Sequence, residues 1–411
     1  MVFACQADSF LREFSSKVVS CAEAKLDLVK DGKKQTIDGF EVVLEDTILF
    51  PEGGGQPSDT GYLNETPVIQ VNRRGAEAVH FVQSKFSVGE TVKQKVDWER
   101  RFDHMQQHSG QHLLSAVGET EFNCPTTSWW LGEETSYVEL ATTSLTQSIV
   151  DKWEAIVNEK IRLALPVTVK VYSKGDPWLD EAHTRGLPKD HEGDVRVISI
   201  EGVDNNMCCG THVSNLSQLQ AIKFLYFEKG KKNKTNLHFL VGGRVLKYLS
   251  SCLERERKLT ELLQSNPNDH VSLVEKLQKS VKNANKNLVN ALKEIAAYEV
   301  EKLKSQEPKP KFFCLHRNEA EMDFINMFLK LFADESVLLL LTVGEPKGPG
   351  HMVLHGEQTA VSALGQQICK LLDGKGAGKG TRFQAKVNNL KNIRAAEKLI
   401  KEYFQTGQNE V

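Results

Sequence analysis

Two pairs of residues that commonly bind metals stand far apart in the sequence. His108 and His112 lie four positions apart in the segment HMQQHSGQHLLS, so on a helix both imidazoles project from one face. Cys208 and His212, in MCCGTHV, repeat that spacing about a hundred residues later. One such pair alone is more often made of ordinary core or surface residues. Two pairs with matched spacing can converge on one ion, so the pattern predicts one Zn²⁺ per chain.

The spacing leaves the choice of ligands and the role of the zinc open. His104 lies four residues before His108, and Cys209 is adjacent to Cys208, so either could replace its neighbour. The helix reads HSGQH rather than HExxH, so it lacks the glutamate base of a zinc peptidase. Three protein ligands and a water would indicate a hydrolytic zinc, whereas four would indicate a structural or substrate-positioning one.

A second feature is the glycine-rich segment FPEGGGQPSDTG, residues 50–61. Gly53, Gly54 and Gly55 allow the backbone to approach a ligand closely and to present bare N–H groups. Considered by itself, the segment is also typical of a tight hairpin turn. It does not end in GK[ST], so it is not a Walker phosphate-binding loop.

The elements that must position these residues change along the chain. Alternating apolar and polar residues before about residue 90 are typical of a small β-barrel or sandwich. Asp97 can cap a helix that runs from Trp98 to about Val117 and ends at Gly118. Mixed elements follow, which indicates an α+β domain. In the first region, strands are expected over 39–50, 67–72 and 78–83. After the helix, a further helix is expected over 146–164, with strands over 167–172, 194–200 and 220–227.

The second half of the chain predicts a helical segment and a separate domain. Helices over 244–264 and 269–304, interrupted at Pro267, are typical of a helical hairpin or antiparallel coiled coil. We expect a rigid spacer in a monomer; dimerisation through this segment is the alternative, and sedimentation would distinguish them. After a linker that ends at Lys311, a small α/β domain is expected. Its elements are strands over 337–343 and 352–354, a helix over 359–372, a glycine-rich loop and a final helix from about Gln384.

Composition sets outer limits on the protein class. The 411 residues are 40% hydrophobic and 26% charged, with a net charge of −2, which excludes a mainly disordered or polybasic protein. The longest apolar run, at 337–343, is far shorter than the roughly 20 residues of a membrane-spanning helix. The N-terminus matches neither a signal nor a transit peptide. Eight scattered cysteines are typical of reduced thiols, so we expect the cytoplasm.

Three segments occur in an order that resembles a known family: TILFPEGGGQPSDTGYL, RRFDHMQQHSGQHLLS and DVRVISIEGVDNNMCCGTHV. They resemble the editing half of alanyl-tRNA synthetase, and the chain is most similar to the freestanding alanyl-tRNA editing proteins of the long type. The resemblance is strongest across 40–245. It implies a trans-editing hydrolase that deacylates alanine tRNA mischarged with serine, and it leaves glycine open as a second substrate. Only about 50 residues precede the glycine-rich motif, so amino-acid activation is not expected.

The resemblance also implies roles for individual residues. Its zinc ligands correspond here to His108, His112, Cys208 and His212, which leaves His104 and Cys209 aside. The family's CGGTH is CCGTH in this chain, and this departure bears on the choice of thiolate. Gln56 matches the glutamine of the family's GGQ motif, and Thr47 a threonine implicated in recognising the serine hydroxyl. The resemblance thus assigns catalysis to Gln56 and Thr47, and substrate binding to Gly53, Gly54, Gly55 and Thr211.

A serine-specific second site has a physical rationale. A pocket built for alanine rejects serine by only about 10² and glycine by about 1–3 kcal/mol. A site that hydrogen-bonds the serine hydroxyl can instead reject the alanyl ester by up to about 10⁴–10⁵, because its polar group would be left unpaired.

The expected multidomain α+β architecture is a β-barrel-like domain over 1–90, a zinc-binding α+β editing domain over 91–243, a helical hairpin over 244–306 and an α/β tRNA-binding domain over 307–411.

The tRNA contact is expected in the last domain. Residues 374–401 carry eight basic side chains against one acid, Glu397, although such a run can be a solvated helix face. The domain resembles the C-terminal domain of alanyl-tRNA synthetase, which contacts the outer corner of the tRNA. Two rival functions stay open: a tRNA-binding factor with a structural zinc, and a deacylase for a different mischarged tRNA. The residues expected to contact phosphates are Lys375, Lys379, Arg382 and Lys386.

Overall fold

The computed structural model describes residues 2–30, 33–173, 175–181 and 194–406. It separates into two compact units, Met1–Lys258 and Leu259–Val411. Its described residues form eight α-helices and several sheets, which confirms the expected α+β class. No helix in this part of the chain is long and apolar enough to cross a membrane. All eight cysteines are free thiols.

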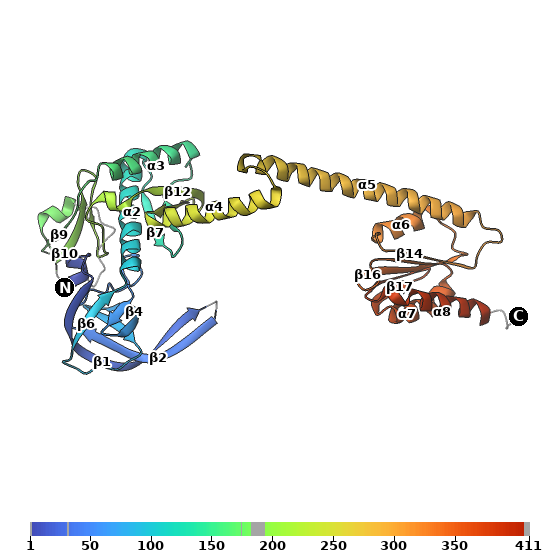
Figure 1. The fold of residues 1–411 in the computed structure, drawn as a ribbon, viewed down its shortest axis with the longest axis horizontal. Coiled ribbons are helices and arrows are strands. Elements are labelled where there is room, and N and C mark those ends of the chain that lie inside the picture. Colours follow the sequence, from blue (N-terminus) through green and yellow to red (C-terminus); the bar gives the residue numbers. More distant parts are fainter. Residues whose placement is uncertain (1, 31–32, 174, 182–193, 407–411) are drawn as a thin grey trace. The chain divides into compact units, whose positions relative to one another are not determined.

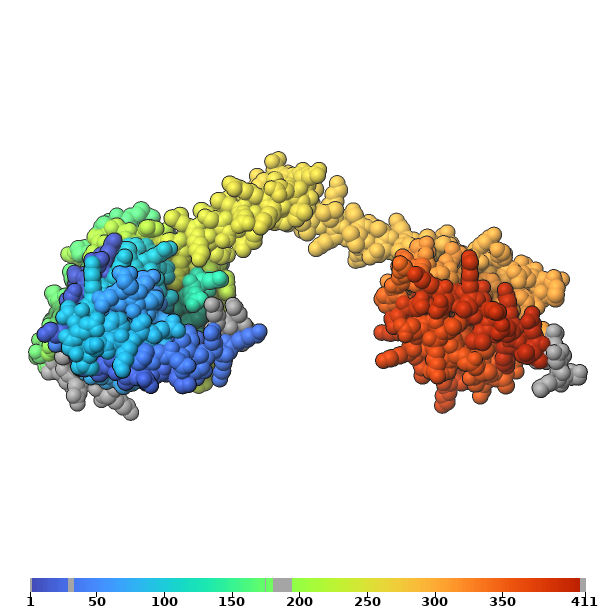
Figure 2. Space-filling view, turned by 60° about the horizontal axis from the view of Figure 1, so that its bottom comes forward, coloured from blue at the N-terminus to red at the C-terminus, as the bar shows by residue number. Residues whose placement is uncertain are grey.

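The first unit begins with six strands that close into a barrel in the order β1-β2-β5-β4-β3-β6 (Figure 1). Alternate residues of each strand point inward, and β6 shows strict alternation of exposed and buried positions. The long hairpin of β1 and β2, which the sequence did not predict, extends beyond the barrel body (Figures 1 and 2). The bounds are β1 (Glu13–Lys30), β2 (Lys33–Leu44), β3 (Gly61–Leu63), β4 (Thr66–Arg74), β5 (Glu77–Val82) and β6 (Thr91–Val96).

The strand expected over 39–50 is wrong in its second half. β2 ends at Leu44. The Asp46 carboxylate then accepts hydrogen bonds from the backbone N–H groups of Ala4, at 3.0 Å, and Thr47, at 2.7 Å. These bonds draw residues 45–50 out of the ladder, and the apolar residues that suggested a strand fill the barrel core instead. Ala4 belongs to a short helix, α1 (Ala4–Ala7).

Helix α2 (Trp98–Phe122) leads from the barrel toward α3 (Gln147–Arg162) (Figure 1). Asp97 caps it as predicted, but the expected end at Gly118 is wrong: the helix ends at Phe122, and the φ of 50° at its C-cap residue, Asn123, is left-handed. Gly118 serves helix packing instead, because a Cβ there would lie 2.1 Å from Cζ2 of Trp153 on α3.

Two antiparallel sheets complete the first unit, with strand orders β12-β13-β8-β7 and β11-β10-β9. Apolar side chains of α2, α3 and these sheets form one continuous core. The predicted strand 167–172 matches β9, and the helix 146–164 and the strands 194–200 and 220–227 match within two residues. The bounds are β7 (Thr126–Leu131), β8 (Ser136–Leu140), β9 (Val167–Tyr172), β10 (Val195–Ile200), β11 (Asp204–Met207), β12 (Ile222–Lys229) and β13 (Thr235–Val241).

The two long helices, α4 (Gly243–Leu263) and α5 (His270–Lys304), match their predicted bounds within one residue. Arg244 is the one buried residue of α4 in the described chain, and its guanidinium holds the Asp103 carboxylate on α2. Most other side chains of both helices are exposed, except near the end of α5. Their antiparallel pairing and dimerisation through them stay predictions.

The second unit is a five-stranded sheet in the order β14-β15-β16-β18-β17, with α5 and α6 on one face and α7 and α8 on the other. Among the described strands of this unit, β14 and β15 run parallel and the other neighbouring pairs are antiparallel. The predicted elements at 337–343, 352–354 and 359–372 correspond to β15, β16 and α7. The bounds are β14 (Phe312–Arg317), α6 (Met322–Leu331), β15 (Leu338–Val343), β16 (Gly350–His355), α7 (Gln358–Leu371), β17 (Gly374–Lys379), β18 (Arg382–Val387) and α8 (Ile393–Thr406).

Two expectations for this unit are wrong. The glycine-rich segment is not a loop but the edge strand β17, and Gln384 lies in β18, so the last helix begins at Ile393 instead. The glycines permit close packing rather than a turn: a Cβ at Gly376 would lie 2.3 Å from the Gln384 carbonyl oxygen. Glycine is uncommon in strand interiors, which is why the pattern favoured a loop.

Candidate metal centre

His108, His112, Cys208 and His212 converge on one buried point of the first unit. Helix α2 supplies the first pair, and the segment after β11 supplies the second. One ligand atom of each residue lies within 4.8 Å of the others. Cys208 Sγ lies 3.5 Å from His108 Nε2 and 3.3 Å from His212 Nε2. Three imidazoles and one thiol form a donor set that can hold a metal ion and is typical of zinc.

The two rival ligands lie outside this cluster. His104 is one helical turn away, and burial lowers its pKa to about 4. The Cys209 carbonyl accepts a hydrogen bond from Gln6 Nε2 at 2.8 Å. Its Sγ faces Gly54, where an added Cβ would lie 3.0 Å away. The structure thus groups the four residues that the resemblance implies, and it leaves His104 and Cys209 outside that group.

Burial determines the electrostatics of the cluster. It lowers the pKa of His108 and of His212 well below the ordinary value, and the neighbouring histidines add to this effect. Burial likewise raises the pKa of the Cys208 thiol to about 12, with Cys209 as the next cause. The lowered pKa keeps the imidazoles of His108 and His212 neutral, which is the form that coordinates a metal.

Gln56 and Thr211 lie directly beside the cluster. Gln56 is fully buried, and its Oε1 accepts from the Thr211 backbone N–H at 3.0 Å and lies 2.9 Å from His108 Nδ1. Its Nε2 donates to Thr211 Oγ1 at 2.8 Å. The contact between Gln56 and His108 requires glycine at position 210, because a Cβ on Gly210 would lie 2.3 Å from His108 Cε1 and 2.8 Å from Gln56 Oε1. The structure thus places these two predicted residues beside the cluster of His108, His112, Cys208 and His212.

The three glycines before Gln56 form a tight turn. Gly53 and Gln56 exchange two backbone hydrogen bonds of 3.1 Å. Gly54 and Gly55 have φ angles of 58° and 78°, a region that favours glycine. A Cβ on Gly55 would also lie 2.4 Å from Nε1 of Trp129 on β7. The segment is therefore a hairpin turn, and that turn places Gln56 at the cluster.

Thr47 lies in the barrel with its hydroxyl already engaged. Its Oγ1 donates to Gln94 Oε1 at 2.8 Å, accepts from the Leu49 N–H at 3.0 Å and lies 2.8 Å from His80 Nε2. Only 1% of the residue is exposed. The partners of this hydroxyl are therefore barrel residues rather than members of the cluster.

Two buried arginines that were not predicted from the sequence hold the glycine-rich motif and the segment around Cys208 in place. Arg101 on α2 forms a fully buried ion pair with Asp59 at the end of the glycine-rich motif. Arg196 on β10 donates to the backbone carbonyls of Cys208, at 2.7 Å, and Gly210, at 2.8 Å. Arg196 stands inside the apolar strand sequence VRVISI, and a charged residue in such a strand is the signal that could have indicated a buried arginine there.

The four basic residues predicted to contact phosphates, Lys375, Lys379, Arg382 and Lys386, lie in the hairpin of β17 and β18. Lys375 is directly opposite Lys386, and Lys379 is opposite Arg382, so all four side chains project from one face. None of the four forms an ion pair with an acidic side chain in the part of the chain that the structure describes.

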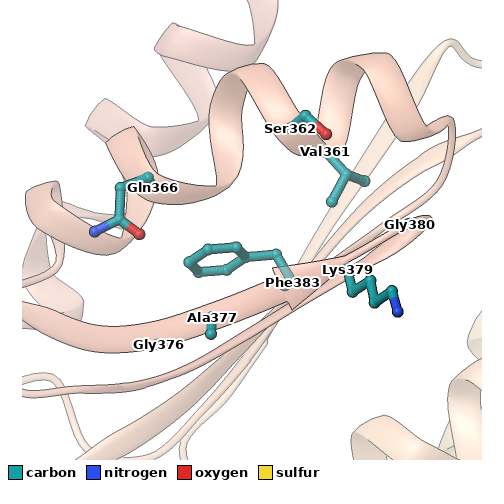
Figure 3. A pocket seen from close by; sticks show the side chains of 9 residues that line it. Val361, Ser362, Gln366, Gly376, Ala377, Lys379, Gly380 and Phe383 are labelled. Carbon is teal, nitrogen blue, oxygen red and sulfur yellow. The ribbon is translucent and has the colours of Figure 1, made fainter.

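The other face of this hairpin borders a cavity of about 400 Å³ between β17 and α7. Figure 3 shows the ring of Phe383 between the strand and the helix, with Ser362 and Gln366 on α7. Gly376 and Gly378 leave space there that side chains would otherwise fill. The hairpin therefore offers a cationic face on one side and a hollow on the other.

Comparison with known proteins places this architecture in a family. Two family models match: the threonyl and alanyl tRNA synthetase second additional domain over residues 195–241, and the class II (A) tRNA synthetases over residues 10–100. The first covers Cys208 and His212, and the second covers the barrel and the glycine-rich motif.

Relatives match over nearly the whole chain. The alanyl-tRNA editing protein Aarsd1-A of Xenopus laevis is 49% identical over 406 residues, 99% of this chain and 98% of the relative. Aarsd1 of Mus musculus is 49% identical over 99% of both chains. The alanyl-tRNA editing protein AlaX-L of Pyrococcus horikoshii is 30% identical over 70% of this chain and 69% of its own length. The chain therefore belongs to the family of alanyl-tRNA editing proteins.

Proposed function

We propose that this protein is a zinc-dependent trans-editing deacylase, which hydrolyses the ester that joins serine to the terminal adenosine of alanine tRNA. The observation that supports this proposal most strongly is the convergence of His108, His112, Cys208 and His212 on one buried point. The chain also belongs to the family of alanyl-tRNA editing proteins. We place the activity in the cytoplasm, in agreement with eight free cysteines.

Bound by all four side chains, a zinc ion would supply a positive charge that orients the aminoacyl group; bound by three of them, it would leave a position at which it could polarise a water. The chain's own residues define the surroundings of that charge. The glycine turn at residues 53–55 brings bare backbone close to Cys209, where the terminal adenosine and its ester can approach. We propose Gly53, Gly54, Gly55 and Thr211 as the substrate-binding residues, and Gln56 as a residue that shapes the pocket.

Thr47 is our candidate for recognition of the serine hydroxyl. Because its hydroxyl bonds Gln94 and lies 2.8 Å from His80, the substrate has to replace one of these internal partners. Thr47→Val is expected to lower the ratio of seryl to alanyl deacylation rates by about 10–100-fold, the value of one hydrogen bond to a buried group. Thr47→Ser keeps the hydroxyl and should retain the ratio. A valine variant with the parent's ratio would assign Thr47 a structural role only.

We further propose that the hairpin face of Lys375, Lys379, Arg382 and Lys386 contacts tRNA phosphates. Two directly opposed pairs of like charge are destabilising unless an anion lies over them. Replacing Lys375, Lys379 and Arg382 by glutamine is expected to raise the apparent KM and to reduce the salt slope by about one per residue.

The matched control removes the same charge from elsewhere in this unit, as Lys391→Gln, Lys398→Gln and Lys401→Gln. Steady-state deacylation between low and physiological salt should show a clearly smaller effect for that triple variant. Equal effects in the two triple variants would show that net charge acts, rather than this face.

A substrate panel tests the proposed function. Alanine tRNA carrying serine, glycine or alanine and threonine tRNA carrying serine are incubated with the full-length protein, and ester loss is followed over time. Rapid loss of serine from alanine tRNA alone, or of serine and glycine, supports the proposal. Loss only from threonine tRNA would indicate a different deacylase. Tight tRNA binding without any deacylation would indicate a binding factor with a structural metal.

A further inference from the structure

The buried Gln56 amide has an orientation that its neighbours dictate. The backbone N–H of Thr211 can only donate, and it lies 3.0 Å from the Gln56 oxygen. At the other end of the amide, Nε2 donates to the Thr211 hydroxyl at 2.8 Å. An amide flipped by 180° would direct its NH₂ group at the backbone N–H, which is repulsive. The oxygen of Gln56 therefore faces His108.

This orientation determines which nitrogen of His108 carries the proton. The Gln56 oxygen, 2.9 Å from Nδ1, can only accept, so Nδ1–H must donate. The lone pair of a neutral imidazole then lies on Nε2, the atom 3.5 Å from Cys208 Sγ. We infer that Gln56 is a positioning residue that holds His108 in the Nδ1–H tautomer and so presents Nε2 to the metal. The inference rests on metal binding by the cluster, as proposed above.

The partner of His212 imposes no such constraint. His212 Nδ1 lies 3.0 Å from Ser109 Oγ, and that oxygen also accepts the Val213 N–H at 3.1 Å. A serine hydroxyl can accept from Nδ1–H or donate to a bare Nδ1, so Ser109 is compatible with either tautomer of His212. Gln56 permits only one tautomer of His108, and because Gln56 is fully buried, water does not compete for its oxygen.

The arrangement gives the glycine-rich motif a defined task at the metal centre. The tight turn of Gly53 and Gln56 delivers a side chain from the barrel to a histidine on α2. Loss of such a partner behind a metal-bound histidine typically costs 10–100-fold in metal affinity. Gln56 thus acts through His108, rather than by contact with the reacting ester.

The test measures metal affinity and the His108 tautomer directly. Gln56→Met keeps the side-chain length without an acceptor, and zinc affinity by competition with a chromophoric chelator is expected to fall about 10–100-fold. In the metal-free variant, ¹⁵N NMR of labelled histidines should show His108 as a mixture of tautomers, whereas the parent shows Nδ1–H. Gln56→Glu retains an acceptor toward both His108 and Thr211, and it should restore most of the affinity and the single tautomer.

Gln107→Met is the matched control. Gln107 is also fully buried, and it bonds the N–H and the carbonyl of Val241 at 3.1 and 2.9 Å. Its loss therefore removes two backbone hydrogen bonds, where the loss of Gln56 removes one, and it does so without touching any of the four clustered side chains. Its zinc affinity should equal that of the parent. Parent-like affinity and tautomer in Gln56→Met, or an equal loss of affinity in Gln107→Met, would overturn the inference. These readouts use no tRNA, so they are independent of whether the protein deacylates any substrate.

Discussion

The double substitution Cys208→Ala, His212→Ala is expected to abolish stoichiometric zinc binding and deacylation together. It removes the thiol and one imidazole from a cluster whose ligand atoms lie within 4.8 Å of one another, and two histidines of one helix do not complete a tetrahedral site. The deacylation rate should fall by more than roughly 100-fold, which is the loss expected when a residue that hydrogen-bonds a metal ligand is removed. Metal content after dialysis and initial rates on seryl alanine tRNA measure both effects.

The chain offers a matched control for this experiment. Cys209→Ala, His104→Ala removes the same two residue types from positions next to the cluster but outside it. This variant should retain one zinc per chain and most of the activity. Zinc retained by the Cys208, His212 variant, or the same loss in both double variants, would contradict the assignment of ligands.

Arg101→Met is expected to cost the first unit about 3–5 kcal/mol of unfolding free energy, because it leaves a buried carboxylate without its counter-ion. Arg101 and Asp59 are both fully buried, and Arg101 also donates to the backbone carbonyls of Ser9 and Ile48. All five tryptophans lie in the first unit, so denaturant unfolding followed by tryptophan fluorescence reports on that unit. Arg162→Met breaks an exposed ion pair with Glu159 and should cost less than about 1 kcal/mol.

The loss in Arg101→Met should depend on pH. Burial raises the pKa of Asp59 and Arg101 opposes this, so removing Arg101 raises the pKa further. A carboxyl group whose pKa is raised in the folded state destabilises the protein. The penalty is full above the folded-state pKa and declines to zero as the pH falls from there to the unfolded-state pKa. The stability difference between parent and variant should therefore narrow from neutral pH toward acid. A difference that stays constant, or one below 1 kcal/mol at neutral pH, would show that the ion pair does not hold α2 to the barrel.

The strongly periodic parts of the fold were predictable from the sequence. Helices α4 and α5, strand β9 and the cap at Asp97 match, because local pattern and tertiary context agree there. Two of the failures share a cause, which is that glycine permits both turns and close packing. Gly118 was interpreted as a helix end and Gly376 as a loop residue, yet each lies against a partner that only the folded chain provides.

The candidate site was predictable only to the level of residue types. Matched spacing indicated His108, His112, Cys208 and His212, but the exclusion of His104 and Cys209 depends on their distances in space. The orientation of Gln56 depends on a backbone N–H that lies 155 residues away in the sequence. Sequence spacing carries no information on this contact, because Gln56, Thr211 and His108 come from three different segments of the chain.

The rate of serine release from alanine tRNA, measured before and after metal removal, tests the central claim most directly. The metal-loaded protein should release serine much faster than alanine, by a ratio of up to about 10⁴–10⁵. Chelation should abolish serine release, and zinc added back in stoichiometric amount should restore it. Equal rates on the two esters, or serine release that persists after complete metal removal, would contradict a zinc-dependent deacylase selective for serine.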